Sequence, residues 1–281
     1  MYQLIKSLNL VFSHPLNKNK KWITLIRLIW WKINQVIIHI PVIVQLTNNR
    51  KCICYPESSN GGLIYYVRLF DYDEMLYILE SLRIDDVFID IGANIGIYSL
   101  LASSVITKGN IYAFEPFPMS YIRLEENIRL NDIRNIQVVK KIVSNDSRFE
   151  YFKTEKESEI NHIAYKDKER LTRISSVKLD DFINKNNIKN ISLMKIDVEG
   201  AEMKVLQGAE KSINNKKILK ILIELNKNNQ HFGTDNQKIA KWLEKKQFTL
   251  YFMERGNLKK VIHLNEINND KIINLLAVKN I

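Results

Sequence analysis

The chain has 281 residues, of which 46% are hydrophobic and 10% aromatic, so it is long enough for one large domain or for a domain with a small appendage. This composition excludes a largely disordered protein. The formal net charge of +11 raises the question of an anionic partner, but the excess is local, because residues 1–60 carry +7 and the remaining 221 residues only +4. The basic character therefore belongs to the N-terminal segment.

The first 19 residues contain no apolar run followed by small residues at a cleavage site, so a secretory signal is not expected. In residues 22–46, apolar side chains recur every three or four positions, which predicts an amphipathic helix that ends at Pro41. Arg27 and Lys32 lie within this span, and for that reason a transmembrane helix is not expected. The side chains of the apolar face are Ile23, Ile26, Trp30, Ile33, Ile37 and Ile40.

Two interpretations of this helix stay open. In the first, which we favour, the apolar face packs on the rest of the protein. In the second, residues 20–46 lie in a membrane interface, where tryptophans and flanking lysines make peripheral contact with headgroups. We expect a cytoplasmic protein in both cases, and the sequence does not predict its oligomeric state. A nucleic-acid partner is not expected, because the apolar density is too high for a groove-reading surface.

Residues 42–46 and 51–55 alternate like short strands, and two asparagines between them predict a turn. Cys52 and Cys54 are the only cysteines of the chain, and we expect ordinary thiols, since so close a pair makes a strained disulfide and no histidine completes a zinc site. Residues 57–62, rich in Ser, Asn and Gly, predict a loop. We place a boundary there, between an N-terminal region of residues 1–60 and a larger domain of residues 61–281.

After a predicted helix at residues 71–82, the apolar run of residues 87–91 is typical of a strand buried on both faces. Residues 92–96 break this run, and the apolar pattern then resumes at helical spacing. Glycine permits positive φ and close approach of a ligand, and Asn94 tolerates left-handed backbone geometry. Asp90 lies near the carboxyl end of the strand, where open α/β sheets bind ligands.

A second strand at residues 110–114 ends at Glu115, which is well placed to accept hydrogen bonds from both hydroxyls of a ribose. The two features together predict a nucleoside ligand. The dinucleotide fingerprint G-x-G-x-x-G is absent, because Asn94 and Ile97 occupy the positions of its second and third glycines, and no P-loop motif is present.

Strands and helices continue to alternate to the end of the chain, which predicts an α/β fold with a mostly parallel sheet and helices on both faces. Ser144 and Asn145 directly follow the third strand. A long polar connection at residues 154–173, flanked by two short edge strands, is of a length that is usually functional or disordered. The further predicted strands are residues 136–143, 149–152, 174–177, 191–196, 218–225, 248–253 and 272–278, and the further helices are residues 119–131, 201–213 and 235–246.

Four ordered segments, D-I-G-A-N-I-G, A-F-E-P, L-E-E-N-I-R-L-N and K-I-D-V-E-G-A-E, resemble the FkbM family of S-adenosylmethionine-dependent methyltransferases. The resemblance runs from about Asp71 to the C-terminus. It implies a Rossmann-like class I methyltransferase fold with a seven-stranded sheet, S-adenosyl-L-methionine as cofactor, and methylation of a hydroxyl group on a sugar, glycan or other small-molecule acceptor. The implied cofactor-binding residues are Asp90, Gly92, Asn94 and Gly96 around the methionine part and ribose, Glu115 at the ribose hydroxyls, and Ser144 and Asn145 near the adenine.

Methyl transfer from a sulfonium is an in-line displacement, so the enzyme must align donor and acceptor and remove a proton from a hydroxyl acceptor. Asp197 follows the fourth central strand, and Glu199 faces the same cleft if the backbone stays extended. Either carboxylate is a candidate general base. We expect no metal, because no histidine or third acid completes a ligand set. His162, Glu224 and His231 are further candidates on the acceptor side.

Two other functions fit the sequence less well. A nucleotide-dependent oxidoreductase requires the glycines that the loop lacks. A cofactor-binding module without turnover is less consistent with the presence of Asp90, Glu115 and Asp197 together.

Overall fold

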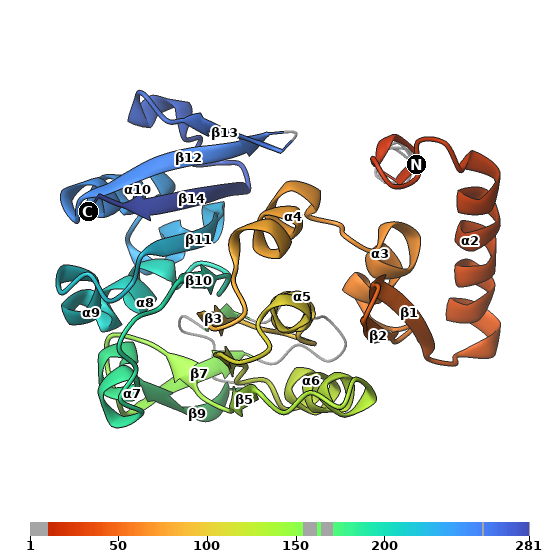
Figure 1. The fold of residues 1–281 in the computed structure, drawn as a ribbon, viewed down its shortest axis with the longest axis horizontal. Coiled ribbons are helices and arrows are strands. Elements are labelled where there is room, and N and C mark those ends of the chain that lie inside the picture. The colour runs from red at the N-terminus through yellow and green to blue at the C-terminus, as the bar shows by residue number, and fades with distance from the viewer. Residues whose placement is uncertain (1–10, 154–161, 164–170, 255, 281) are drawn as a thin grey trace.

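A computed structural model describes residues 11–153, 162–163, 171–254 and 256–280. These residues form a central mixed sheet with helices packed around it (Figure 1). Within these residues the sheet has eight strands in the order β13-β12-β14-β11-β10-β3-β4-β5. The five strands from β11 to β5 run parallel, and β14 is inserted antiparallel between β11 and β12. The strands are β3 (Val87–Ile91), β4 (Asn110–Phe114), β5 (Ile136–Val139), β10 (Leu193–Ile196), β11 (Lys220–Leu225), β12 (Phe248–Glu254), β13 (Asn257–Lys260) and β14 (Ile273–Lys279). The predicted fold is confirmed, with β13 as an eighth strand that forms a hairpin with β12.

Helices cover both faces of the sheet, because the side chains of each central strand alternate between two apolar cores. In β3, Phe88 belongs to one core, whereas Ile89 and Ile91 belong to the other. The first core lies under α4 (Tyr72–Ser81) and α5 (Ile97–Val105), and the second under α7 (Leu179–Lys185), α8 (Glu202–Gly208), α9 (Glu210–Asn214) and α10 (Asn236–Lys245). The helix α6 (Pro118–Leu130) packs through Leu124 on a smaller cluster with Ala93 and Ala113. The single helix predicted at residues 201–213 is divided into α8 and α9 at Ala209.

The loop predicted at residues 57–62 is wrong, since most of it forms the start of α3 (Ser59–Val67). Ser58 caps this helix by accepting a hydrogen bond from the N–H of Gly61 at 3.0 Å. A β-carbon on Gly61 would lie 2.6 Å from the Tyr55 carbonyl oxygen, so the glycine serves close packing of the first turn. The domain boundary that we placed at this loop stays a prediction.

The strand predicted at residues 136–143 is also wrong beyond Val139. The chain turns there, with the N–H of Lys141 donating to the Val139 carbonyl at 2.8 Å. It then enters a second sheet, in the order β6-β9-β7-β8, instead of continuing along the edge of the first. This sheet comprises β6 (Ile142–Val143), β7 (Phe149–Lys153), β8 (His162–Ile163) and β9 (Leu171–Val177). Most of the predicted long connection lies outside the described residues.

The N-terminal region packs beside α3 as a helix and a hairpin, as predicted. The helix α2 (Lys21–Ile33) continues into a π-helical turn, η1 (Asn34–Ile38), and β1 (Val42–Thr47) pairs with β2 (Arg50–Cys54). Trp31 is fully buried and stacks on Tyr65 of α3, with the ring centroids 5.0 Å apart. Cys52 and Cys54 are buried and form no disulfide, as expected. Among the residues that the structure describes, no helix is both long and apolar enough to span a bilayer.

Candidate active site

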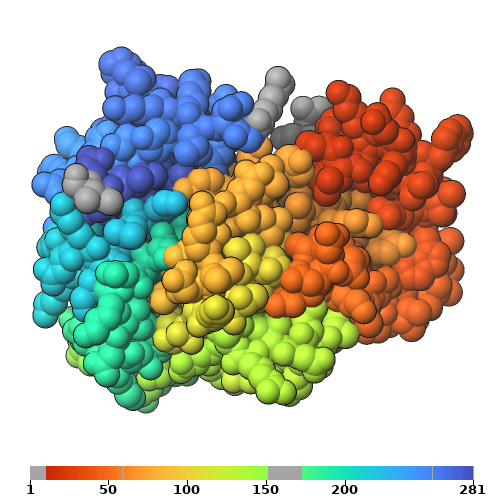
Figure 2. Space-filling model, viewed as in Figure 1, coloured from red at the N-terminus to blue at the C-terminus, as the bar shows by residue number. Residues whose placement is uncertain are grey.

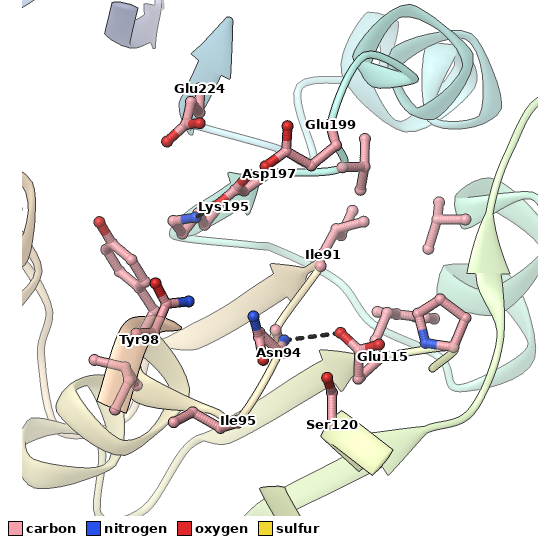
Figure 3. A pocket seen from close by; sticks show the side chains of 18 of the residues that line it. Ile91, Asn94, Ile95, Tyr98, Glu115, Ser120, Lys195, Asp197, Glu199 and Glu224 are labelled. Carbon is pink, nitrogen blue, oxygen red and sulfur yellow. Dashed lines mark hydrogen bonds and ion pairs between the residues drawn. The ribbon is translucent and has the colours of Figure 1, made fainter. Parts of the chain in front are cut away.

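A cavity of about 430 Å³ opens at the carboxyl ends of β3, β4, β10 and β11, where the glycine loop and the predicted acids meet (Figure 3). This volume lies within the usual range for small-molecule sites. The strand ends contribute Gly92, Asn94, Glu115, Asp197 and Glu199 to its wall, and the wall is closed on another side by residues of α3 and of the segment before α4, namely Asn60, Leu63, Phe70 and Asp71.

The loop after β3 has the left-handed backbone that its sequence predicts, with φ of 82° at Gly92, 50° at Asn94 and 91° at Gly96. The reason for the glycines differs from our expectation. A β-carbon on Gly92 would lie 1.8 Å from the Asp197 carbonyl oxygen, and one on Gly96 would lie 2.2 Å from Leu124 Cδ1. The loop therefore needs glycine to pack against the protein itself, and Gly96 is not part of the cavity wall.

Asp90 lies below this loop, outside the cavity wall. Its side chain is almost completely buried, and its Oδ2 accepts a hydrogen bond from Ser99 Oγ at 2.6 Å. Burial raises the pKa of Asp90, while the nearby charge of Lys195 opposes that shift. The contact with Ser99 joins the end of β3 to the first turn of α5, so Asp90 supports the loop from beneath.

Glu115 follows β4 and reaches the cavity, where it binds the backbone of two loops. Its Oε2 accepts from the N–H of Asn94 at 2.8 Å, and its Oε1 accepts from the N–H of Phe117 at 2.7 Å. Burial raises the pKa of Glu115 to about 7 in spite of these two hydrogen bonds. The amide oxygen of Asn94 is buried at the same wall and has no hydrogen-bond partner among the described residues. These groups fit a bound nucleoside, whose hydroxyl and amino groups donate hydrogen bonds.

Three acids gather on the opposite side of the cavity, above β10 and β11 (Figure 3). One carboxylate oxygen each from Asp197, Glu199 and Glu224 lies within 4.8 Å of the others. The backbone of Glu199 is not extended as expected, since its φ is 54° and Gly200 follows with a φ of 111°. This tight turn, rather than strand alternation, brings Glu199 back towards Asp197.

Lys195 lies among these acids and supplies a positive charge. Its Nζ is 2.9 Å from Asp197 Oδ2 and 4.2 Å from the ring centroid of Tyr98. Contrary to expectation, a third acid lies near Asp197 and Glu199, since Glu224 occupies that position. The absence of a metal stays a prediction, and it now rests on the Lys195 ammonium at the cluster.

Burial and mutual charge shift the pKa values of the residues in this cluster. Burial raises the pKa of Glu224 to about 9, with the charge of Asp197 adding to the shift and that of Lys195 opposing it. It also raises the pKa of Glu199, again with a contribution from Asp197. The pKa of Lys195 is raised, because the attraction of the surrounding carboxylates outweighs the effect of burial. The raised pKa favours the protonated form of Glu224, which can donate a hydrogen bond.

Two amides hold Glu199 in place. The side chains of Asn226 and Asn228 donate to its Oε2 at 3.0 and 3.3 Å. Both asparagines follow β11, at the start of the short helix η2 (Lys227–Phe232). The carboxylate is thus oriented by a loop from the neighbouring strand.

The structure does not bring Ser144 and Asn145 to the cavity. Ser144 is buried and donates to Glu150 Oε1 at 2.8 Å, while Asn145 donates to Gln207 Oε1 at 2.9 Å. Because the chain turns at Val139 into the second sheet, residues 141–143 form the cavity wall in their place.

The two candidate histidines are not placed at the site. His231 lies on η2, exposed and outside the cavity wall. The side chain of His162 lies outside the described residues, and its backbone pairs with Lys153 in the second sheet.

Three residues of the site were missed in the sequence. Lys195 had a usable signal, since it lies two positions before Asp197, and strand alternation places the two side chains on one side. No sequence pattern marks Asp71 and Tyr98 as site residues, because they come together only in the folded chain. The Tyr98 hydroxyl donates to Asp71 Oδ2 at 2.8 Å, and both residues line the cavity.

A doubly wound sheet with this glycine loop after β3, a buried acid after β4 and an antiparallel β14 beside β11 defines a Rossmann-like class I methyltransferase fold. The sequence profile of the methyltransferase FkbM domain matches residues 90–250. The chain belongs to the FkbM methyltransferase family. It is an S-adenosylmethionine-dependent methyltransferase, which excludes the oxidoreductase alternative.

Similar proteins include the hexuronic acid methyltransferase AglP of Haloferax volcanii, which is 26% identical over 173 residues that span 62% of this chain and 67% of that protein. Methyltransferase 1 of Beauveria bassiana is 27% identical over 188 residues, spanning 59% of this chain and 75% of that protein. A putative methyltransferase from Streptococcus mutans, solved in complex with SAH, is 13% identical with a TM-score of 0.45, over 74% of this chain and 96% of that one.

Proposed function

We propose that this enzyme methylates a hydroxyl group of a sugar or glycan. The observation that carries the proposal is the position of Asp197, Glu199 and Glu224 in the same cavity as Glu115. A small-molecule or glycan acceptor with several hydroxyl groups suits a wall that offers carboxylates as hydrogen-bond acceptors and a protonated carboxyl as donor. The similarity to a hexuronic acid methyltransferase supports the same acceptor class.

On the cofactor side, we assign Glu115 to the two ribose hydroxyls and the Asn94 amide oxygen to a donor of the same ligand. Gly92 and Gly96 shape the loop, and Asp90 positions it through Ser99. The adenine contact that the sequence suggested for Ser144 and Asn145 we now assign to the wall formed by residues 141–143. When bound, S-adenosylmethionine supplies an electrophilic methyl group on a sulfonium.

On the acceptor side, we assign Glu199 as the general base that takes the proton of the acceptor hydroxyl. Its raised pKa brings it closer to the pKa that suits a base at neutral pH, and the amides of Asn226 and Asn228 hold its Oε2. Asp197, which is paired with Lys195, accepts a hydrogen bond from a second hydroxyl and so orients the ring. Glu224 donates a hydrogen bond to the acceptor.

Methyl transfer to a panel of neutral hexoses, hexuronic acids and glycolipids, followed by mass spectrometry, tests this function. We expect turnover on at least one class, and a loss of about 100-fold or more in kcat for Glu199→Gln. Binding of S-adenosylhomocysteine, measured by calorimetry, should stay unchanged in this variant, and Glu244→Gln on the exposed side of α10 is the matched control. Cofactor binding without turnover on any saccharide would instead indicate a binding module.

We also propose that the enzyme works in the cytoplasm, in peripheral contact with a membrane through residues 20–46. The acceptor would then be a lipid-linked or surface saccharide. The exposed apolar side chains of α2 support this location.

A further inference from the structure

The helix α2 and the turn η1 carry an apolar stripe on the side that faces away from the protein. Its members recur every three or four residues, which is the spacing of one helical face. Trp22 is 79% exposed, Ile26 65% and Ile37 72%, values more typical of charged residues. We call this surface the outer stripe, and it consists of Trp22, Ile26, Ile29, Ile33, Val36, Ile37 and Ile40.

The opposite side of the helix already makes the contacts that hold it on the protein. Thr24, Trp31 and Asn34 are buried there, and Trp31 stacks on Tyr65. The Asn34 side chain donates to the Ile40 carbonyl and accepts from the Ile40 N–H, which fixes the end of the turn. The helix therefore packs on the rest of the protein, as we favoured, but mainly through this side, whereas the isoleucines of the predicted face are exposed.

The segment that carries the outer stripe is rich in basic residues and contains no acidic residue. The first acidic residue of the chain is Glu57. A second copy of the chain seated on this surface would bring two clusters of like charge together, which opposes self-association. An apolar stripe with a basic rim matches an interfacial helix on anionic lipid. The basic residues near the stripe are Lys18, Lys20, Lys21, Arg27 and Lys32.

We propose that the outer stripe inserts into the headgroup layer of an anionic bilayer, with the lysines on lipid phosphates. The inference rests on the proposed peripheral contact and adds the inserting face, the orientation and the lipid charge. Residues 11–50, red to orange in Figure 2, form one side of the molecule, so the stripe can reach a flat surface.

This orientation also places the cavity near the bilayer. The helix α3 lies between the two, because Tyr65 contacts Trp31 of α2, while Asn60 and Leu63 of the same helix line the cavity. An acceptor held at a membrane surface by a lipid would thus enter along α3.

Co-sedimentation of the full chain with phosphatidylcholine vesicles, with and without phosphatidylglycerol, tests the proposal. We expect binding to the anionic vesicles, little binding to the neutral ones, and release by salt. The double variant Ile26→Asp with Ile37→Asp should bind at least tenfold more weakly. Ile262→Asp is the matched control, since Ile262 is 66% exposed but lies after β13 at the far end of the sheet, and it should bind like the unaltered protein.

The charge contribution is tested separately with Lys20→Gln and Lys21→Gln together, which should weaken binding to anionic vesicles only. Lys259→Gln with Lys260→Gln, on the exposed strand β13, is the control and should have no such effect. The proposal is overturned if the unaltered protein does not bind, or if the stripe variant and its control bind equally. It is also overturned if the protein is a dimer that the stripe variant dissociates and that does not bind vesicles.

Methyl transfer to a soluble saccharide without vesicles separates this inference from the proposed reaction. The stripe variant should retain the kcat and KM of the unaltered protein, because the outer stripe is not part of the cavity wall. Vesicle binding in a protein that methylates no saccharide would refute the reaction and leave the membrane inference standing.

Discussion

Lys195 and Asp197 project from the same side of the end of β10, with Nζ and Oδ2 2.9 Å apart, and Lys195 is only 4% exposed. The charge of Asp90 also acts on this lysine. The positive charge of this buried ammonium offsets the repulsion between the neighbouring carboxylates. The acceptor side of the site is therefore organised around one cation.

Replacing this cation should destabilise the fold. Lys195→Met leaves buried carboxylates without their partner, and we expect a loss of about 3–5 kcal/mol in the free energy of unfolding. Urea unfolding followed by circular dichroism measures it. Lys189→Met, at an exposed position before β10, should cost less than about 0.5 kcal/mol. Equal stability of the two variants would show that the ion pair does not support the structure.

Glu224 should make stability depend on pH in an unusual direction. The pKa of this carboxyl is about 9 in the folded protein and about 4.3 in an unfolded chain. Between these values the folded state holds a proton that the unfolded state has released, so the stability contributed by this group falls as pH rises. Glu224→Gln removes this dependence, and the variant should gain stability relative to the unaltered protein from pH 5 to pH 9. A stability difference that stays constant over this range, as expected for the control Glu80→Gln, would contradict the assignment.

Glu115 should make cofactor binding depend on pH near neutrality. Its pKa is about 7, and we assign its ionised form to the ribose hydroxyls. Affinity for S-adenosylhomocysteine should fall by roughly fivefold to tenfold between pH 7.5 and pH 6, as the carboxylate takes up a proton. Calorimetry at several pH values measures the change. In Glu115→Gln the affinity should be weaker and nearly independent of pH, and a slope like that of the unaltered protein would assign the effect to another group.

Gly200 should be intolerant of any side chain. A β-carbon there would lie 2.8 Å from the Asn228 backbone, and the φ of 111° disfavours other residues. Gly200→Ala should displace Asn228, which orients Glu199, and we expect a loss of roughly 2–4 kcal/mol together with a lower kcat. Gly233→Ala is the control, because its φ is also positive but, apart from its chain neighbours, no atom of the described residues lies within 4 Å of the added carbon. Its loss should be only about 1 kcal/mol, with unchanged kcat.

Much of the fold could be predicted because buried strands and amphipathic helices leave local patterns. The run at residues 87–91 and its helix are one example. The errors occurred where long-range packing decides the outcome. Position 61 in the first turn of α3 is a glycine because the Tyr55 carbonyl leaves no room for a β-carbon, and in the sequence this glycine resembled one of a loop. Residues 142–143 pair with β9, which follows much later in the chain.

The site follows the same division. Gly92, Asn94, Glu115, Asp197 and Glu199 follow strands that share an edge of the sheet, so the sequence could place them together. The functions assigned to them stay predictions. Glu224 was recognised as a candidate, but its approach to Glu199 depends on the turn at Gly200, which strand alternation does not describe.

The closeness of Gly92 to the Asp197 carbonyl has a consequence for engineering. The two loops touch through their main chains, with no side chain between them to absorb a change in shape. A cofactor loop grafted from a relative would have to arrive together with that relative's acidic loop. Chimeras that exchange both loops together should fold. In chimeras that exchange only one loop, the two backbones would not fit against each other.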